Sequence, residues 1–194
     1  MGPRRRADAQ RNERSLLESA SAVFVRAGVD APVREIAAAA GVGVGTIYRH
    51  FPTRADLVIA VYRHQVEACA AAGPQLLASE APGRALDRWI ELFVDFLVTK
   101  NGLAHALQSD DERFRALHAW FLDELVPVCA ALLDAAADAG EVRTQVPPIE
   151  LLRAIGNLCL GSGSADQELS RRMVRVLLAG LRSAPGPDAP LASS

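Results

Sequence analysis

Residues 33–57 decide the fold, and they read VREIAAAAGVGVGTIYRHFPTRADL. Apolar and small residues predict two short helices here, at 33–40 and 45–50. Gly41 separates them and offers the left-handed backbone conformation that a tight turn needs. Two short helices joined by such a turn form a helix-turn-helix, which is a common layout of DNA-binding domains.

The apolar residues of this stretch predict its inward side. Ala37 is small enough to let the second helix approach the first closely. We expect a small core built from both helices and the segments beside them: Val23, Phe24, Ile36, Val42, Ile47, Phe51 and Leu57. A recognition helix presents its remaining residues to the major groove. We therefore predict DNA contacts by Arg34, Val44, Gly45, Thr46, Tyr48, Arg49, His50 and Arg54.

The residues at the start of the second helix suit contact with bases. Gly45 lets the backbone come close to DNA, because it has no side chain. Val44 and the methyl group of Thr46 match the methyl group of thymine, and the Thr46 hydroxyl can form a hydrogen bond to a base. This end of the helix is therefore expected to read the sequence.

The residues that follow suit contact with phosphates. Tyr48 and His50 can donate hydrogen bonds to phosphate oxygens, while Arg34 and Arg54 place charge at the starts of helices, where anions bind. Two alternatives stay open at this point. Tyr48 could instead pack against the protein, and His50 could instead cap the end of its helix.

The phrase GVGVGTIYRHFPTR at 41–54 resembles the DNA-binding domain of TetR-family regulators, and the resemblance extends over 10–57. It implies that Thr46, Tyr48, His50 and Arg54 contact phosphates or bases. The segment FVDFLVTKNGLAHAL at 93–107 is similar to one TetR subgroup. A phosphate-binding glycine loop is the alternative for GVGVGT, but it needs a strand before it and a long helix after it.

The whole chain predicts an all-α fold. It has 194 residues, half of them apolar, and it is rich in Ala and Leu, which favour helices. Gly73 with Pro74 is expected to weaken or end a helix, Gly102 to break one, and Pro127 to kink or split one. About nine helices follow: 9–27, 33–40, 45–50, 53–72, 83–99, 103–109, 111–139, 148–162 and 165–182.

Charge and composition predict four segments. Residues 1–54 contain nine arginines and five acidic residues, which gives +4, while the remainder carries −6. A basic head on an acidic body indicates that only the head meets a polyanion. The arginines at 4–6 either follow DNA or form a solvated tail. The predicted segments are a flexible basic arm (1–8), the helix-turn-helix (9–54), a ligand-binding and dimerisation domain (55–183) and a disordered tail (184–194).

The larger domain is expected to hold a small molecule rather than to catalyse a reaction. It has no recognisable catalytic constellation. Polar atoms among apolar walls are what a ligand site needs, and the apolar composition favours a largely hydrophobic ligand. An aromatic stripe at helical spacing is core more often than pocket, so His105 and Asn157, polar groups within apolar helices, are the better pocket candidates. The predicted lining is Tyr62, Trp89, Phe93, Phe96, His105, Leu107, Trp120, Phe121 and Asn157.

The last two predicted helices are apolar on more than one side, so each needs two partners. We expect them to form a four-helix interface between two copies of the chain, as the family resemblance also implies. A two-fold dimer places two recognition helices about one DNA turn, ~34 Å, apart on a palindromic operator. The predicted interface residues are Leu151, Leu152, Ile155, Leu158, Met173, Val174, Leu177 and Leu181.

These features predict a cytoplasmic repressor that a small, largely hydrophobic ligand releases from DNA. No signal peptide and no membrane-spanning segment is expected. No metal site or cofactor is expected, and Cys69, Cys129 and Cys159 are expected to be buried free thiols rather than redox sensors. The alternatives are a regulator without a small-molecule ligand, an activator, and, more remotely, an enzyme with an incidental helix-turn-helix.

Overall fold

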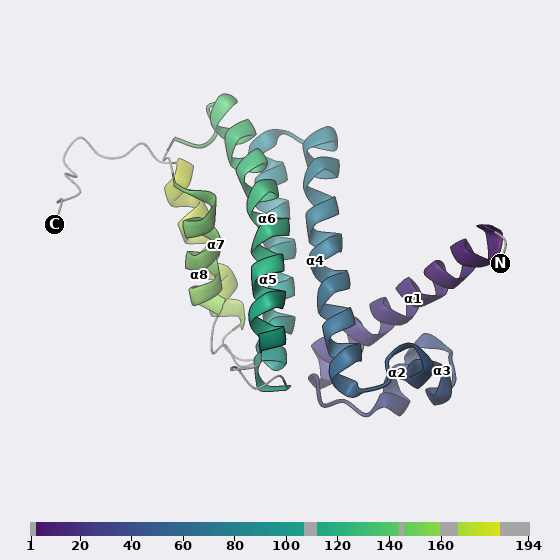
Figure 1. The fold of residues 1–194 in the computed structure, drawn as a ribbon. Coiled ribbons are helices and arrows are strands. Elements are labelled where there is room, and N and C mark those ends of the chain that lie inside the picture. Colours follow the sequence, from purple (N-terminus) through teal and green to yellow (C-terminus); the bar gives the residue numbers. More distant parts are fainter. Residues whose placement is uncertain (1–2, 107–111, 144–145, 160–166, 183–194) are drawn as a thin grey trace. The chain divides into compact units, whose positions relative to one another are not determined.

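The computed structural model describes residues 3–106, 112–143, 146–159 and 167–182. Those residues contain helices and no strands, which confirms the predicted all-α fold (Figure 1). The chain divides into two compact units, residues 1–68 with 96–119 and residues 69–95 with 120–194. The helices are α1 (Pro3–Ala27), α2 (Val33–Ala40), α3 (Val44–His50), α4 (Arg54–Ser79), α5 (Pro82–Ala106), α6 (Glu112–Asp138), α7 (Pro148–Cys159) and α8 (Gln167–Arg182).

The predicted helix ends at Gly73–Pro74 and at Gly102 were wrong, and so was the predicted split at Pro127. Helix α4 continues through Gly73 and Pro74, α5 continues through Gly102, and α6 is unbroken at Pro127. Both prolines are exposed, so each frees a backbone carbonyl on the solvent side of its helix, where water can hydrate it. The long helices bury an apolar face, and this burial outweighs the ~1 kcal/mol cost of an internal glycine.

The first helix also begins earlier than predicted. Its start is Pro3 rather than a residue near Ala9, so most of the predicted arm at 1–8 is helical. The segment 3–10 consists mainly of Arg, Ala and Gln, which are good helix formers, and proline is favoured at the first helical position. The predicted tail at 184–194 lies outside the described residues.

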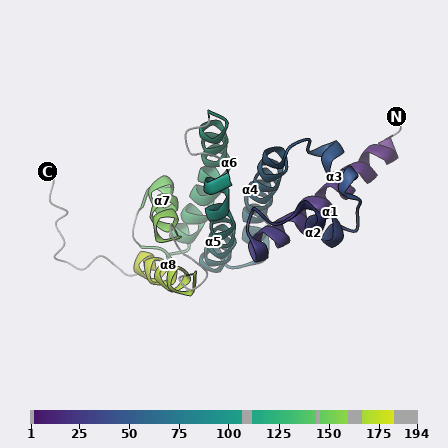
Figure 2. The same ribbon diagram turned by 90° about the horizontal axis from the view of Figure 1, so that it is seen from below.

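The first unit contains the helix-turn-helix, with α1 packed on α2 and α2 packed on α3 (Figure 2). Gly28 and Gly41 both adopt positive φ, at 79° and 66°, so each ends its helix in the conformation that glycine tolerates best. The predicted core is confirmed except that Val42 is only half-buried. The buried members are Val23, Phe24, Ile36, Ala37, Ile47, Phe51 and Leu57.

The start of α4 is capped by its own side chains. The Asp56 amide donates to Thr53 Oγ1 at 3.1 Å, and the Thr53 amide donates to Asp56 Oδ2 at 3.0 Å. This reciprocal pair is a capping box, with Asp56 in the position usually held by Glu or Gln. Thr53 is therefore the N-cap of α4, at the start of the helix predicted over 53–72.

Arg54 attaches the first turn of α4 to the loop between α1 and α2. Its Nε and Nη2 atoms both donate to the Val29 carbonyl, and Nη2 also donates to the Ala31 carbonyl at 2.6 Å. The guanidinium carbon lies 5.9 Å from the centroid of the Phe24 ring, which is within cation–π range. Farther along α4, Gln65 Nε2 donates to Ser21 Oγ of α1 at 2.6 Å. These contacts hold α4 against the helix-turn-helix.

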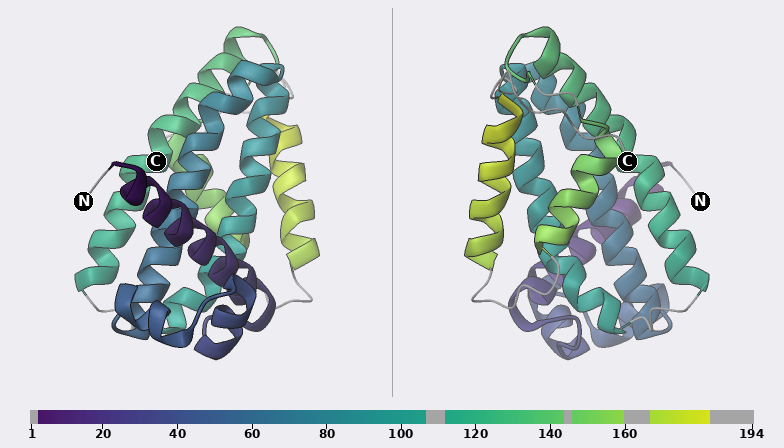
Figure 3. Two further views of the ribbon diagram at one scale, coloured as in Figure 1. Left: turned by 90° about the vertical axis from the view of Figure 1, so that its right-hand side faces the viewer. Right: turned by 90° about the vertical axis from the view of Figure 1, so that its left-hand side faces the viewer.

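The second unit is built around closely packed helices. A Cβ atom at Gly73 of α4 would collide with the Val128 side chain of α6, so a larger residue would displace Val128 where these two helices approach. The Trp89 indole of α5 donates to the Cys69 carbonyl of α4 at 2.9 Å, which satisfies its buried N–H. Helices α7 and α8 contact each other (Figure 3), and the Ser170 hydroxyl donates to the Leu158 carbonyl at 2.7 Å.

Part of α6 is long and apolar enough to cross a membrane when judged by length and composition alone, namely residues 116–138. In this fold the apolar residues Leu117, Leu125 and Leu132 are buried, while Asp123 and Asp134 are exposed. An amphipathic pattern of this kind is typical of a core helix in a helical bundle.

Loss of the Arg54 guanidinium should destabilise the first unit. Arg54→Ala leaves two buried backbone carbonyls without their charged donor, so the free energy of unfolding should fall by about 2 kcal/mol. Arg54→Lys should lower the free energy of unfolding by less, because the ammonium group keeps the positive charge. Some loss should remain, because an ammonium group lacks the forked geometry of a guanidinium. Urea unfolding followed by circular dichroism measures both.

The matched control is Arg49→Ala, which removes an exposed arginine from the same helix-turn-helix. It should change the unfolding free energy by no more than about 0.5 kcal/mol. Equal losses for Arg49→Ala and Arg54→Ala would show that charge, and not the hydrogen bonds of Arg54, accounts for the effect.

Candidate nucleic-acid interface

Helix α3 has one buried side chain and a broad exposed side. Ile47 retains only 1% of its accessible surface, whereas Tyr48, the next residue, retains 47%. Val44, Gly45, Arg49 and His50 are exposed as well, and Thr46 is half-buried. The burial of Ile47 therefore sets how α3 is rotated, and the predicted contact residues of this helix all lie away from the core.

The turn before α3 is built from backbone groups. Gly41 closes α2, with its own amide and that of Val42 bonded to the Ala38 and Ala37 carbonyls at 3.3 and 3.0 Å. Gly43 then occupies the N-cap position of α3 in an extended conformation, with no side-chain cap. Val42 is thus the one side chain between the two glycines of the turn, and it is half-buried.

Gly45 has no role that the fold requires. A Cβ atom there would meet no other atom within 4 Å, and its φ is not positive. A glycine in such a place costs helix stability, so its presence calls for another reason. Gly45 leaves a flat backbone surface on the outer side of α3.

The two open alternatives for Tyr48 and His50 are not supported by the geometry. Tyr48 is too exposed to be a core residue, and the part of the chain that the structure describes contains no hydrogen-bond partner for its hydroxyl. The α3 C-terminus is closed by the Phe51 amide, which donates to the Ile47 carbonyl at 2.8 Å. The His50 ring is exposed and lies 6.1 Å from the Phe51 ring, measured between centroids.

Arg34 and Arg54, predicted as a pair, lie in different environments. Arg34 is exposed on α2, as a residue available to a phosphate should be. Arg54 is half-buried and donates to the Val29 and Ala31 carbonyls, so it positions the helix-turn-helix from inside. The sequence could not reveal this role, because the acceptors are backbone atoms more than twenty residues earlier.

The predicted pocket aromatics are buried, but they pack against one another. In the first unit, the rings of Tyr62 and Phe96 meet edge to face at 5.2 Å. In the second unit, Phe93 stacks on Trp89 at 5.8 Å and on Phe121 at 6.1 Å. Such contacts are what a filled core makes, so the rings occupy space that a ligand would need.

Four further predicted pocket residues have other outcomes. Trp120 is half-buried, and Asn157 is exposed on α7, so the expectation that Asn157 lines an interior pocket was wrong. The side chain of His105 and the whole of Leu107 lie outside the described residues.

Burial raises the pKa of the Tyr62 hydroxyl far above its ordinary value, so Tyr62 stays neutral.

Only some of the residues predicted to form the dimer interface lie on the surface of a single chain. Leu151, Leu152, Ile155, Val174 and Leu181 are buried within a single chain, so a partner cannot reach them and their assignment was wrong. Leu158 is exposed, and Met173 and Leu177 are half-buried. Leu169 and Val176 are 45% and 61% exposed. The sequence interpretation missed Leu169, and it counted Val176 among the apolar residues of this helix without placing it in the interface.

A spacing signal could have separated the two sides of α8. Ser170, Val174, Leu178 and Leu181 form one stripe at steps of three and four, and they are buried. Leu169, Met173, Val176 and Gly180 form a second stripe at the same steps, and they face outward. When the two stripes are treated as one apolar set, the buried side of α8 cannot be distinguished from its exposed side.

The three cysteines are buried and free, as predicted. Burial raises the pKa of the Cys69 and Cys129 thiols to about 12, so both stay protonated and unreactive at neutral pH. Among the described residues, no group of His, Cys, Asp or Glu side chains is arranged to hold a metal ion.

Two sequence families match the chain. The family described as "Bacterial regulatory proteins, tetR family" matches residues 16–61, which include the whole helix-turn-helix. The family described as "Transcriptional regulator SbtR-like, C-terminal domain" matches residues 81–183, which is more than half of the chain. None of the curated proteins compared with the chain matches it significantly.

Solved structures agree with this assignment. A TetR transcriptional regulator from Streptomyces coelicolor is 35% identical, with a TM-score of 0.75, and the match covers 89% of this chain and 99% of that one. A TetR transcription regulatory protein from Mycobacterium vanbaalenii is 36% identical, with a TM-score of 0.71 and coverage of 92% and 99%. A transcriptional regulator from Saccharomonospora viridis in complex with choline is 20% identical, with a TM-score of 0.61 and coverage of 88% and 96%, and it shares the fold.

These matches confirm the resemblance first noted at residues 41–54, and they identify a regulator rather than an enzyme. The matched families account for both parts of the chain, the helix-turn-helix and the larger helical domain. The protein is a DNA-binding transcriptional regulator of the TetR family.

Proposed function

We propose that this regulator is a cytoplasmic homodimeric repressor that binds a palindromic operator through α3. The observation that supports the proposal best is the exposed side of α3, where the side chains have no packing role. Val44, Gly45 and Thr46 are at the start of α3, the end that a recognition helix presents to base edges. Tyr48, Arg49 and His50 follow and, together with Arg34, supply donors for phosphates. Repression rather than activation is the simplest outcome for a protein that occupies an operator.

Gly45→Ala should separate DNA binding from folding. The added methyl group meets open space within the protein, so the unfolding free energy should stay equal or rise slightly. The same methyl group would keep α3 from its closest approach to DNA, so operator affinity should fall at least on the order of tenfold, about 1.4 kcal/mol. Fluorescence anisotropy with a labelled operator, together with urea unfolding, measures both quantities.

Ser79→Ala is the control, because it makes a similarly small change at an exposed residue of α4 in the second unit, outside the helix-turn-helix. Its operator affinity should equal that of the unaltered protein. Unchanged affinity in Gly45→Ala would remove α3 from the contact surface and contradict the proposal.

The dimer is proposed to form through the outward stripe of α8 and the exposed Leu158 of α7. Monomeric proteins rarely leave apolar side chains aligned in this way, and such patches typically mark an interface. A second copy of the same stripe is a self-complementary partner, as a two-fold interface requires. The contributing residues are Leu158, Leu169, Met173, Val176 and Leu177.

Val176→Glu should therefore convert the dimer into a folded monomer. Val176 is 61% exposed in the single chain, so the charge does not disturb the core, but it would be buried against the partner. Sedimentation equilibrium reports the mass, and circular dichroism reports the fold. Leu92→Glu, at an exposed leucine of α5, should leave the dimer intact. A Val176→Glu variant that remains dimeric would place the interface elsewhere.

We further infer that a small, largely hydrophobic molecule releases the repressor from its operator. Family membership supports release by a small molecule, as does the fold shared with the choline-bound regulator from Saccharomonospora viridis, while the hydrophobic character rests on the apolar composition of this chain. Release requires that the ligand bind the DNA-incompetent state more tightly than the competent state. The mutual packing of Trp89, Phe93 and Phe121 favours a second candidate, a regulator whose interior is filled by its own side chains.

A thermal-shift screen of hydrophobic and cationic small molecules, with choline included, distinguishes the two candidates. A ligand at one hundred times its Kd stabilises the folded state by about 2.7 kcal/mol, which raises Tm by several degrees in a chain of this size. The ligand-released repressor predicts at least one compound that raises Tm and also weakens operator binding. If no compound does both, the regulator without a ligand is the better description.

A further inference from the structure

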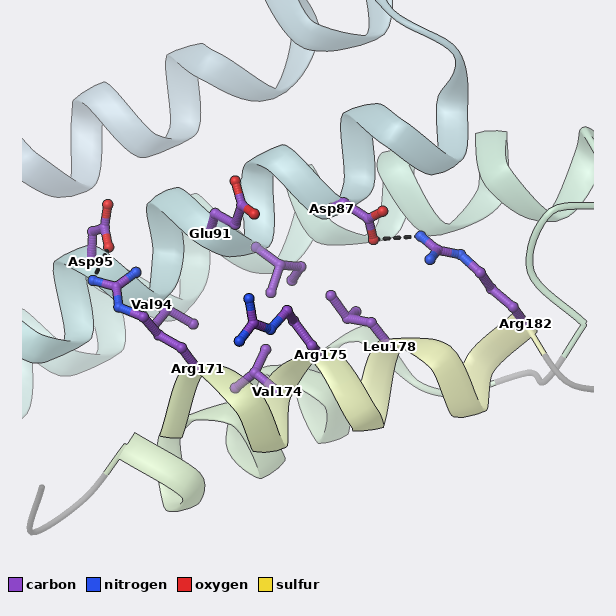
Figure 4. A pocket seen from close by; sticks show the side chains of 10 residues that line it. Asp87, Glu91, Val94, Asp95, Arg171, Val174, Arg175, Leu178 and Arg182 are labelled. Atoms are coloured by element: carbon purple, nitrogen blue, oxygen red, sulfur yellow. Dashed lines mark hydrogen bonds and ion pairs between the residues drawn. The ribbon is translucent and has the colours of Figure 1, made fainter. Parts of the chain in front are cut away.

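A groove between α5 and α8 combines an apolar floor with charged walls of opposite sign (Figure 4). Its volume is about 460 Å³, which is within the usual range for small-molecule sites. The floor consists of Ile90 and Val94 from α5 with Val174 and Leu178 from α8. All of these residues belong to the second unit, and the groove is distinct from the aromatic cluster of Trp89, Phe93 and Phe121.

The two walls of the groove carry equal numbers of opposite charges. Helix α5 contributes Asp87, Glu91 and Asp95, which are four residues apart and therefore lie on one side of the helix. Helix α8 contributes three arginines on the facing wall: Arg171, Arg175 and Arg182. Three carboxylates thus face three guanidinium groups, and the lining is neutral overall.

Ion pairs across the groove close its two ends. Arg171 Nη2 lies 2.6 Å from Asp95 Oδ1 at one end, and Arg182 Nη2 lies 2.5 Å from Asp87 Oδ1 at the other. Figure 4 shows these pairs on either side of Arg175, which extends from α8 toward α5. The ends of the groove are therefore already satisfied within the protein.

In the middle of the groove, the charged side chains are not paired across it. Glu91 forms no ion pair with any of the described residues. Arg175 pairs with Glu168 of its own helix at 3.4 Å, but these side chains are 66% and 80% exposed, and an exposed pair of that length contributes little. One carboxylate and one guanidinium consequently remain available over an apolar floor.

The groove remains accessible if α8 also forms the proposed dimer. Two residues along an α-helix correspond to about 200° of rotation. Met173 therefore lies nearly opposite Arg171, and Gly180 nearly opposite Leu178 and Arg182. The outward apolar stripe and the groove are thus on opposite sides of α8.

We propose that this groove binds a small amphipathic zwitterion, a molecule with one carboxylate and one ammonium group on a short apolar body. The ligand carboxylate pairs with Arg175, its ammonium group pairs with Glu91, and its apolar part lies on the floor. A ligand with only one charge would leave either Arg175 or Glu91 unmatched. The proposal does not depend on the operator, on the direction of regulation or on a hydrophobic ligand in the core.

Isothermal titration calorimetry on the full chain tests the proposal with defined probes. L-leucine has adjacent charges, and ε-aminocaproate has charges at the two ends of its chain. Hexanoate and hexylamine each carry only one of the two charges. At least one zwitterion should bind with a Kd of about 1 mM or tighter, and both singly charged probes should bind at least about tenfold more weakly. Absence of saturable zwitterion binding, or equal binding of a singly charged probe, overturns the proposal.

Variants then locate the site. Arg175→Gln and Glu91→Gln should each weaken zwitterion binding on the order of tenfold, because each removes one charge-assisted contact. Arg172→Gln is the matched control, since Arg172 is exposed on α8 outside the groove and should have no effect. Binding that survives both groove substitutions would place the zwitterion elsewhere and contradict the assignment.

A charge exchange separates recognition from structural damage. In the double variant Glu91→Arg with Arg175→Glu, the walls keep one charge of each sign in exchanged places. Because ε-aminocaproate can reverse its direction, its affinity should return to within a few-fold of the unaltered protein. If the double variant binds as weakly as the single variants while circular dichroism shows an intact fold, the two side chains are not the charged contacts.

Discussion

A helix of seven residues is not stable in water by itself, because nucleating a helix costs more than so few hydrogen bonds return. Helix α3 exists only because Ile47 is buried against the rest of the helix-turn-helix. That constraint leaves the other side chains of α3 outside the core. Stability of the helix and exposure of its contact residues therefore have the same physical origin.

The support for α3 extends outward in layers. Gly41 permits the turn, Ala37 permits the close approach of α2, and the α1–α2 loop holds α2 in place. Arg54 then fixes that loop to the start of α4 through the Val29 and Ala31 carbonyls. An arginine at this position carries charge that DNA could use, yet its hydrogen bonds are made inside the protein. Arg54 thus positions α4 against the helix-turn-helix, whereas Arg34 and Arg49 are exposed.

Local signals predicted the helix-turn-helix well. The glycine at 41, the cap at Thr53 and the inward placement of Ile36 and Ile47 follow from conformational preference and helical spacing, which involve near neighbours in sequence. Helix continuity at Gly73 and Pro74 was mispredicted because packing between distant segments, such as α4 against α6 at Val128, is not visible in local sequence. The Arg54 contacts and the Glu91–Arg175 groove also depend on distant segments, so the spacing of charges within one helix could not reveal them.

The apolar residues of α7 and α8 also show what the sequence alone cannot predict. Leu151, Ile155 and Val174 were predicted to face a partner, but they are core residues of the single chain. Hydrophobicity alone cannot say whether a side chain meets its own chain or another copy. The distinction appears only when the stripe containing Leu169 and Val176 is seen to be separate from the buried stripe.

In vitro selection of binding sites from random double-stranded DNA tests the central claim most directly, with the full chain at an ionic strength near physiological, about 0.15 M. A two-fold dimer that binds DNA through α3 should enrich an inverted repeat whose half-sites are centred about one helical turn, ~34 Å, apart or slightly more. The half-site sequences should depend on the residues at the start of α3. Recovery of DNA with no sequence preference over the starting pool would contradict the account, because exposed basic residues alone provide only non-specific binding.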